Sequence, residues 1–298
     1  MLYQLFSRPF IVFIAILSSN LFYSQSNKEF KPIDVFSLEY VSNPKISPNG
    51  RKVLYVRNFK DIMTDKNYSN IWIINFDGTN NTPLTTGNQN DFDPTWSNSG
   101  DKFTYKSNSD DSVQLYLHVL DQKSNQKLTN LQKSVSSVSW SEDDEYLVFT
   151  SFVEKSSSSF IKMPIKPKGA KWNKPAIEIN DIKYRSDGRG YLTQGFSQIF
   201  ILPVEGGTPR QITFLNNNAA SPKWLTKNKI IFSGNLHEDS DIEPRNSEIY
   251  FVDTISEKIK PLTFRLGPDY SPVISHDKSK IAYLGFDEKY LGYQQNNI

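Results

Sequence analysis

Apolar and polar residues alternate in short runs along the chain, and clusters of turn-forming residues separate the runs. This two-residue alternation predicts β-strands, for example over residues 53–57 and 103–107. After residue 40, no long stretch shows the 3.6-residue spacing of an amphipathic helix. The pattern therefore predicts a chain built almost entirely of strands.

The turns between these strands repeat one motif. Its clearest copy is 94–103, where a strand ends at Trp96-Ser97, a turn passes through Gly100, and a new strand begins at Lys102. Aligned on Ser97 or its counterpart, the copies fall at Ser47, Ser97, Ser141, Ser186, Leu225 and Ser275. The spacing is roughly 39 to 50 residues, which is typical of the four-stranded blades of a β-propeller.

We therefore predict an all-β fold, a β-propeller of four-stranded antiparallel blades, with about five complete blades and one partial blade in an open ring. The third blade is expected over 135–179 and the fourth over 182–213, while the sixth starts at Ser271 and stays incomplete. In such a ring, one face of the first blade, around Val53, Tyr55, Ile71 and Ile73, is expected to lack a neighbour.

The N-terminus predicts a secretory signal peptide over 1–24, which leaves 25–298 as the propeller domain. Arg8 precedes the apolar run Phe10–Leu17, and small polar residues follow it. The run is too short to span a bilayer as a stable helix, so no membrane span is expected once the leader is removed. A buried first helix is the alternative interpretation. The leader predicts a secreted or periplasmic protein.

Composition excludes several kinds of chemistry. The chain has no cysteine, which rules out disulfides, thiol catalysis and thiolate metal sites. Its net charge is +2, and its basic residues form no stripe, so nucleic acid is not an expected partner. The chain also lacks a nucleophile elbow, a phosphate loop and a metal-binding histidine pair. We predict no catalytic residue, no metal site and no cofactor in this chain.

The polar insertion over 237–245 is the one dense cluster of charged residues. We predict that it lies at the mouth of the propeller and contacts a substrate or partner through His237, Asp239, Asp241 and Arg245. A solvated hairpin tip is the alternative. The spacing of its acidic residues does not complete a calcium-binding loop.

The repeats resemble the N-terminal propeller of the prolyl oligopeptidase family of serine peptidases, in its acylaminoacyl-peptidase and dipeptidyl-peptidase-like branch. The turn Ser47–Gly50 and the two Trp-Ser turns fit the repeats of this family, and TolB-like propellers share them. Residues 184–191, followed by Gln198-Ile199-Phe200 and 206–213, look like the middle of that propeller. The resemblance covers the chain from about residue 32 to its end.

The resemblance implies a propeller that caps an α/β-hydrolase domain and filters peptide substrates by size. None of that domain's catalytic motifs is present here, so the chain is expected to be a piece truncated before the hydrolase. Whether it takes part in an enzyme depends on that missing domain. Two alternatives stay open: a stand-alone periplasmic TolB-like propeller that binds protein partners, and a remnant of a broken gene.

Overall fold

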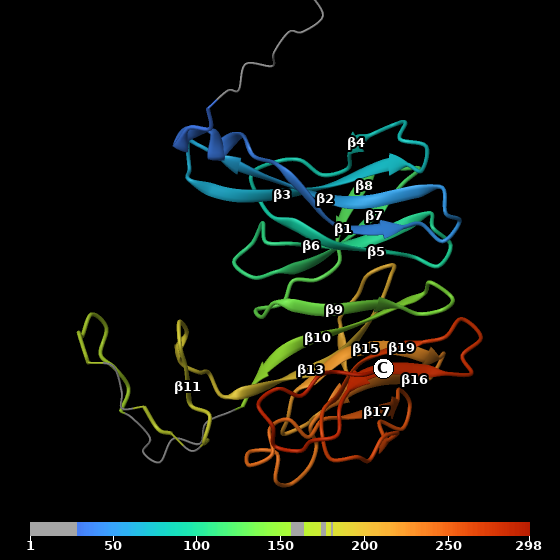
Figure 1. Cartoon of the computed structure of the whole chain (residues 1–298). Helices are drawn as coiled ribbons and strands as arrows, with labels where there is room; N and C mark the ends of the chain where they lie inside the picture. The colour runs from blue at the N-terminus through green and yellow to red at the C-terminus, as the bar shows by residue number, and fades with distance from the viewer. Residues whose placement is uncertain (1–28, 156–163, 174–176, 180) are drawn as a thin grey trace, which may run out of the picture.

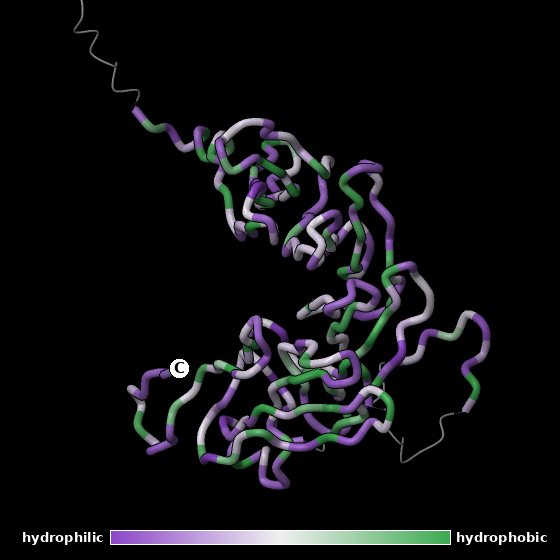
Figure 2. The backbone as a smooth tube through the Cα atoms, turned by 90° about the vertical axis from the view of Figure 1, so that its right-hand side faces the viewer, coloured by the Kyte–Doolittle hydropathy of each residue, from purple (hydrophilic) through white to green (hydrophobic). Residues whose placement is uncertain are grey.

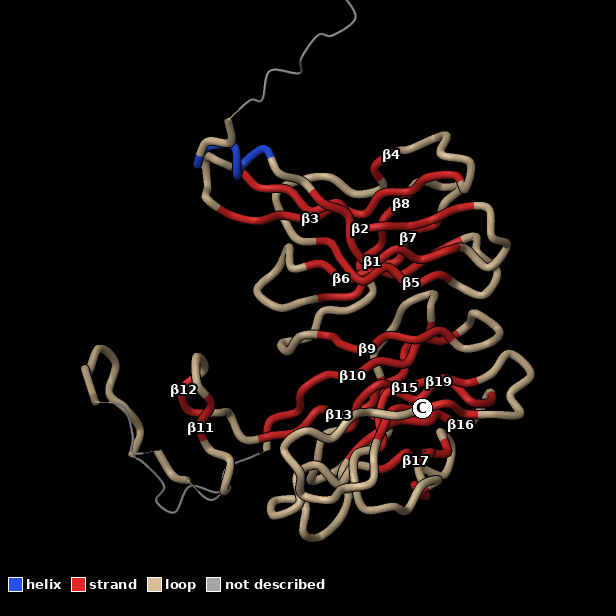
Figure 3. Tube along the Cα trace, viewed as in Figure 1, coloured by secondary structure: helices blue, strands red, loops and turns tan. Residues whose placement is uncertain are grey.

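The computed structural model describes residues 29–155, 164–173, 177–179 and 181–298. The predicted signal peptide lies outside the described residues. The fold opens with a short 3₁₀ helix, η2 (Pro32–Ser37), which Pro32 starts favourably because a first-turn residue needs no backbone donor. Almost everything after it is strand or loop (Figure 3). Within the described residues, no helix has the length and apolar character needed to cross a membrane.

Four antiparallel four-stranded sheets follow one another along the chain (Figure 1). The first two sheets take their strands in chain order. They comprise β1 (Tyr40–Ile46), β2 (Lys52–Asp61), β3 (Lys66–Asn75) and β4 (Thr82–Pro83), then β5 (Asp91–Trp96), β6 (Lys102–Ser107), β7 (Gln114–Val119) and β8 (Ser124–Lys127). These sheets are the first two blades of the predicted propeller.

The third and fourth blades have the same antiparallel order, and a two-stranded fifth blade follows. Their strands are β9 (Val135–Trp140), β10 (Tyr146–Glu154), β13 (Gly195–Pro203) and β14 (Arg210–Gln211), then β15 (Ala219–Thr226), β16 (Lys229–Gly234), β17 (Glu248–Asp253) and β18 (Ile259–Pro261), then β19 (Asp269–Ile274) and β20 (Ile281–Gly285). The predicted all-β propeller of four-stranded blades is confirmed.

The predicted number of blades was wrong, because the expected third and fourth blades are a single blade. Strand β10 pairs with β13 over nine residues, from Tyr146↔Pro203 to Glu154↔Gly195, so residues 155–194 form an insertion between its second and third strands. Inside the insertion, β11 (Arg185–Ser186) pairs only with β12 (Gly190–Tyr191), in a hairpin that stands away from the blade (Figure 1). The structure therefore has four complete blades and a two-stranded fifth.

The blades are arranged around an axis that their first strands line. Strand β1 contacts β5, β5 contacts β9, β9 contacts β15, and β15 contacts β19. The blades follow an arc rather than a closed ring, and the first and fifth blades lie on either side of the gap (Figure 2). The open ring that the sequence predicted is therefore confirmed for the described residues.

The hydrophobic core lies between neighbouring blades. Leu54 and Ile71 of the first blade pack against Phe103 of the second, and similar clusters join the second to the third blade and the third to the fourth. Of the four residues expected to lack a neighbour, Val53 and Tyr55 are half-buried and do not belong to the core cluster between the first two blades. The expectation was wrong for Ile71 and Ile73, because both are buried against the second blade. The strand alternation turns these two side chains inward, so burial on that face offsets the cost of ordering the blade.

The serine on which the repeats were aligned stabilises the repeated turns by hydrogen bonding. The Oγ of Ser47 accepts a hydrogen bond from the backbone N–H of Lys52, at 3.0 Å. The Oγ of Ser141 accepts one from the N–H of Tyr146 at 2.9 Å, and that of Ser275 accepts one from Lys280 at 3.0 Å. Such local bonds favour a turn over a continuing strand. This explains why the motif marks the start of the second strand in each of these blades.

Candidate functional site

The long loops gather at one end of the propeller. They follow the second strand of a blade, as residues 155–194 follow β10 and residues 235–247 follow β16, whereas the serine-containing turns join first to second strands at the opposite end. We call residues 235–247 the mouth loop. The candidate site is built from this loop and the strands beneath it.

The mouth loop carries all four residues that the sequence singled out. Asp239 and Asp241 are exposed, and their side chains have no hydrogen bond or ion pair among the described residues. His237 and Arg245 both lie beside carboxylates: His237 Nε2 is 3.7 Å from Glu248 Oε1, and Arg245 Nη2 is 2.9 Å from Glu288 Oε2. The four residues therefore share one loop but not one ligand-sized cluster, and their predicted role as contact residues stays a prediction.

The C-terminal segment 286–298 lies against the mouth loop. The hydroxyl of Tyr290 donates to Glu243 Oε1 at 3.1 Å, close to the ion pair of Arg245 with Glu288. Within the loop, Asn235 Nδ2 donates to the carbonyl oxygen of Glu243 at 2.7 Å. These contacts hold the mouth loop against the C-terminal segment.

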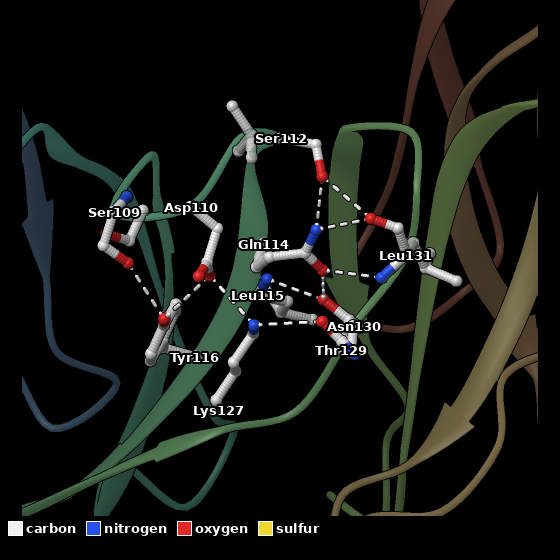
Figure 4. A network of polar contacts seen from close by, with 12 residues as sticks. Ser109, Asp110, Ser112, Gln114, Leu115, Tyr116, Lys127, Thr129, Asn130 and Leu131 are labelled. Carbon is white, nitrogen blue, oxygen red and sulfur yellow. Dashed lines mark hydrogen bonds and ion pairs between the residues drawn. The ribbon is translucent and has the colours of Figure 1, made fainter. Parts of the chain in front are cut away.

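A hydrogen-bonded polar pair ties the third strand to the chain at the outer edge in the second, third and fourth blades. In the second blade, Thr129 Oγ1 accepts from the N–H of Leu115 at 2.9 Å and donates to Gln114 Oε1 at 2.8 Å (Figure 4). The amide of Gln114 also bonds both backbone groups of Leu131 (Figure 4). In the third blade, Gln198 and Thr213 repeat this arrangement. The fully bonded amide therefore fixes the outer strand.

Glu248 takes the place of this glutamine under the mouth loop. Its side chain is 2% exposed, and the hydroxyl of Thr263 donates to its Oε2. Burial raises the pKa of the Glu248 carboxyl, and the negative charge of Asp269 raises it further. The sequence analysis did not identify Glu248, although the fifteen-residue spacing from Glu248 to Thr263 matches that from Gln114 to Thr129.

Asp269 is the second buried carboxylate of the site. Its side chain is fully buried, and its Oδ1 accepts from Arg265 Nε at 2.8 Å and from Arg265 Nη2 at 2.5 Å. The guanidinium also reaches Asp287 Oδ1 at 3.2 Å. Arg265 therefore compensates the charge of Asp269.

A polar groove of about 770 Å³ opens between the first and second blades at the same end. Its lining is rich in amide and hydroxyl groups: Asp65, Lys66, Asn67, Tyr68, Asn88, Gln89, Asn90, Asn108 and Ser109. The sequence analysis missed this groove, and the run Asn88-Gln89-Asn90 is its only sequence signal. The side chains suit a polar ligand better than an apolar one, because they supply many hydrogen-bonding groups.

His118 is a packing residue of the second blade. It is buried, stacks on Phe103 with ring centroids 4.9 Å apart, and its Nδ1 lies 2.8 Å from Asn125 Oδ1. Burial lowers the pKa of His118. Within the described residues, no three histidine or acidic side chains are placed to hold a metal ion.

Comparison with known proteins supports a relationship to peptidases, although no family model matches the chain. It is 26% identical over 210 residues to the uncharacterized peptidase YuxL of Bacillus subtilis. That alignment covers 70% of this chain and 31% of YuxL, so the chain spans about a third of its curated relative's length.

The fold is similar to that of two kinds of solved structure. An acylaminoacyl peptidase in complex with Z-Gly-Gly-Phe-chloromethyl ketone superposes with a TM-score of 0.63 at 17% identity, over 85% of this chain and 37% of that one. TolB from Acinetobacter baumannii superposes with a TM-score of 0.50 at 15% identity, over 86% and 49%. The predicted resemblance to the N-terminal propeller of these peptidases is confirmed.

Proposed function

We propose that this chain is the non-catalytic, substrate-gating propeller of a secreted serine peptidase of the prolyl oligopeptidase family, whose whole form hydrolyses peptides. Two findings together carry the proposal. The chain is similar in sequence to a peptidase over 210 residues, and it folds as radial blades like those of acylaminoacyl peptidase.

The radial arrangement of the blades supports the proposed gating. The first strands line an axis, and we expect the opening along it to admit a narrow, extended peptide and to exclude a folded protein. The mouth loop and the groove between the first two blades lie at one end of this axis and present polar groups there. A hydrolase domain docked at either end would then receive substrates that pass along the axis.

A stand-alone TolB-like propeller that binds protein partners is the second candidate function. The similarity in fold to TolB favours it, and it needs no further domain. The two candidates differ in what the gene encodes. The first predicts that the coding DNA continues in frame beyond Ile298 to a Gly-x-Ser-x-Gly elbow, with an aspartate and a histidine after it. A stop codon directly after Ile298 would instead favour the binding module.

We also propose that the protein is exported and loses its leader. The support is Arg8 followed by the apolar run Phe10–Leu17. Mass spectrometry of the protein from its native host should find an N-terminus after residue 18 and no intact Met1. An intact Met1 would contradict export through a cleaved leader.

A further inference from the structure

The polar groove between the first and second blades contains asparagines whose side-chain oxygen is already engaged. Asn67 Oδ1 accepts a hydrogen bond from Lys60 Nζ at 3.1 Å. Asn90 Oδ1 accepts one from the hydroxyl of Ser69 at 3.4 Å, and Asn108 Oδ1 accepts one from the backbone N–H of Asn90 at 2.7 Å. The Nδ2 groups of these three asparagines have no hydrogen bond among the described residues. Because the oxygen is occupied, the NH₂ group is the part of each amide that remains for a ligand.

A fourth free amide lines the same groove. It belongs to Asn88, in the connection from β4 to β5, and its side chain forms no hydrogen bond within the part of the chain that the structure describes. Gln89 differs, because its Nε2 donates to the carbonyl oxygen of Thr86 at 2.8 Å and to Asp91 Oδ2 at 3.0 Å. We call the four residues with a free NH₂ group the donor asparagines: Asn67, Asn88, Asn90 and Asn108.

The charged residues of the groove favour a neutral ligand. Asp65 and Lys66 are the only charged residues in its lining, they have opposite signs, and both are exposed to solvent. Their formal charges cancel, and salt screens exposed charges. An anion or a cation therefore gains little over an uncharged molecule. Four neutral donors suit an uncharged molecule rich in hydrogen-bond acceptors, and the carbonyl oxygens of a peptide main chain are such acceptors.

An open edge of strand β3 also lies in this groove. Strand β4 covers only residues 72–73 of β3, and at Ser69 an isolated parallel bridge to Asn90 takes its place. The N–H of Ser69 donates to the carbonyl oxygen of Gln89 at 3.3 Å, so the backbone groups of Asn67, two residues earlier, point to the same side. No described residue pairs with Asn67 on that side. Such an edge can take up an extended peptide through main-chain hydrogen bonds.

We propose that this groove binds a neutral, extended stretch of peptide main chain, whose carbonyl oxygens accept hydrogen bonds from the donor asparagines. Binding of this kind does not depend on the side chains of the peptide, because it uses main-chain groups alone. A sugar fits less well, since its hydroxyl groups donate as well as accept and a sugar does not extend a strand edge. The choice of a peptide rests on the proposed function, and the groove then holds the substrate at the mouth end of the axis.

The test observes the donor groups themselves by NMR. The 298-residue chain is labelled with ¹⁵N at its asparagines, and the side-chain NH₂ signals are assigned by single substitutions. It is titrated with N-acetyl-tetraalanine amide, with the same peptide carrying an E-alkene in place of one central amide bond, and with maltotetraose. The signals of the donor asparagines should shift saturably with the peptide. The alkene keeps the extended shape but removes a carbonyl acceptor, so this analogue should bind about fivefold more weakly, as expected for one hydrogen bond.

Matched variants and a matched signal separate binding in the groove from misfolding. Asn88→Leu removes a donor that makes no internal bond and should weaken peptide binding about fivefold, whereas Asn88→Gln keeps the donor and should retain binding. Asn216→Leu is the control, because Asn216 is exposed and precedes β15 by three residues, as Asn88 precedes β5. The signal of Asn49 should not shift, because this asparagine also has an engaged oxygen but lies in a turn at the opposite end.

Four results would contradict the proposal in different ways. Saturation transfer from the chain to the methyl protons of the peptide, without a shift of the donor asparagines, would overturn the groove and leave peptide entry standing. Absence of any peptide binding would overturn both the groove and the proposed entry of peptides. If maltotetraose shifted the donor signals at lower concentration than the peptide, the assignment of a peptide ligand would be wrong. Equal binding of the peptide and its alkene analogue would show that the carbonyl oxygens are not recognised.

Discussion

The indole Nε1 of Trp140 donates a hydrogen bond to the carbonyl oxygen of Thr95, 3.0 Å away on the preceding blade. Trp96 makes the same bond to Lys45 one blade earlier, at 2.8 Å. The Trp-Ser pair is therefore a joint between blades as well as a turn signal. Its tryptophan ties the blade to its predecessor, and its serine starts the turn into the next strand.

Replacing Trp96 by phenylalanine should lower the free energy of unfolding by about 1 kcal/mol more than the same change at Trp224. Both side chains are half-buried, but the indole N–H of Trp224 has no hydrogen-bond partner among the described residues. Both substitutions remove similar ring area, so the difference isolates the bond to Lys45. Urea denaturation of the two variants measures it. Equal losses would show that the cross-blade bond contributes nothing.

Thr129→Val should destabilise the chain by roughly 1–3 kcal/mol, because it leaves buried polar groups without their partner. The hydroxyl of Thr129 serves both the N–H of Leu115 and the amide oxygen of Gln114. Thr129→Ser keeps the hydroxyl and should lose much less stability. Thermal unfolding of both variants provides the comparison. If valine and serine behaved alike, lost packing rather than lost hydrogen bonding would explain the effect.

Glu248 should make the chain less stable as pH rises. The folded-state pKa of this carboxyl is raised by burial, so the folded chain holds the proton at pH values where the unfolded chain has released it. Its contribution is fully present below the ordinary glutamate pKa and is lost as pH rises toward the raised folded-state value. Glu248→Gln mimics the amides of Gln114 and Gln198 and should remove this loss.

The measurement is the urea unfolding midpoint of the wild type and of Glu248→Gln across pH 4 to 8. The variant should gain stability over the wild type as pH rises. The control is Glu238→Gln, which removes the same charge from an exposed residue of the mouth loop. A Glu248→Gln profile parallel to that of the wild type would contradict a raised pKa.

The fold class followed from the sequence because the alternation and the serine turns are local signals. The blade count did not, because the turn at Ser186 lies in the insertion and resembles those at Ser141 and Ser275. Long-range pairing of β10 with β13 decides that question, and spacing alone does not reveal it. A spacing of fifteen residues between a polar residue and a threonine, as from Gln198 to Thr213, occurs in each complete blade. Counting these pairs would have given the right number of complete blades.

The candidate site was only partly predictable for a similar reason. The charged residues over 237–245 are conspicuous in the sequence, and they do lie on a shaped loop at the mouth. Glu248 and Asp269 become important only because folding buries both carboxyl groups, close enough for the charge of Asp269 to act on Glu248. This proximity is not visible in local sequence.

The most direct test of the central claim uses the protein from its native host. Antibodies raised against this propeller would capture the native polypeptide, which is then treated with a fluorophosphonate probe that labels activated serines. The account predicts a captured polypeptide longer than 298 residues that carries the label at one serine outside this chain, while the isolated chain stays unlabelled. A captured polypeptide that ends at Ile298 and takes up no label would contradict it.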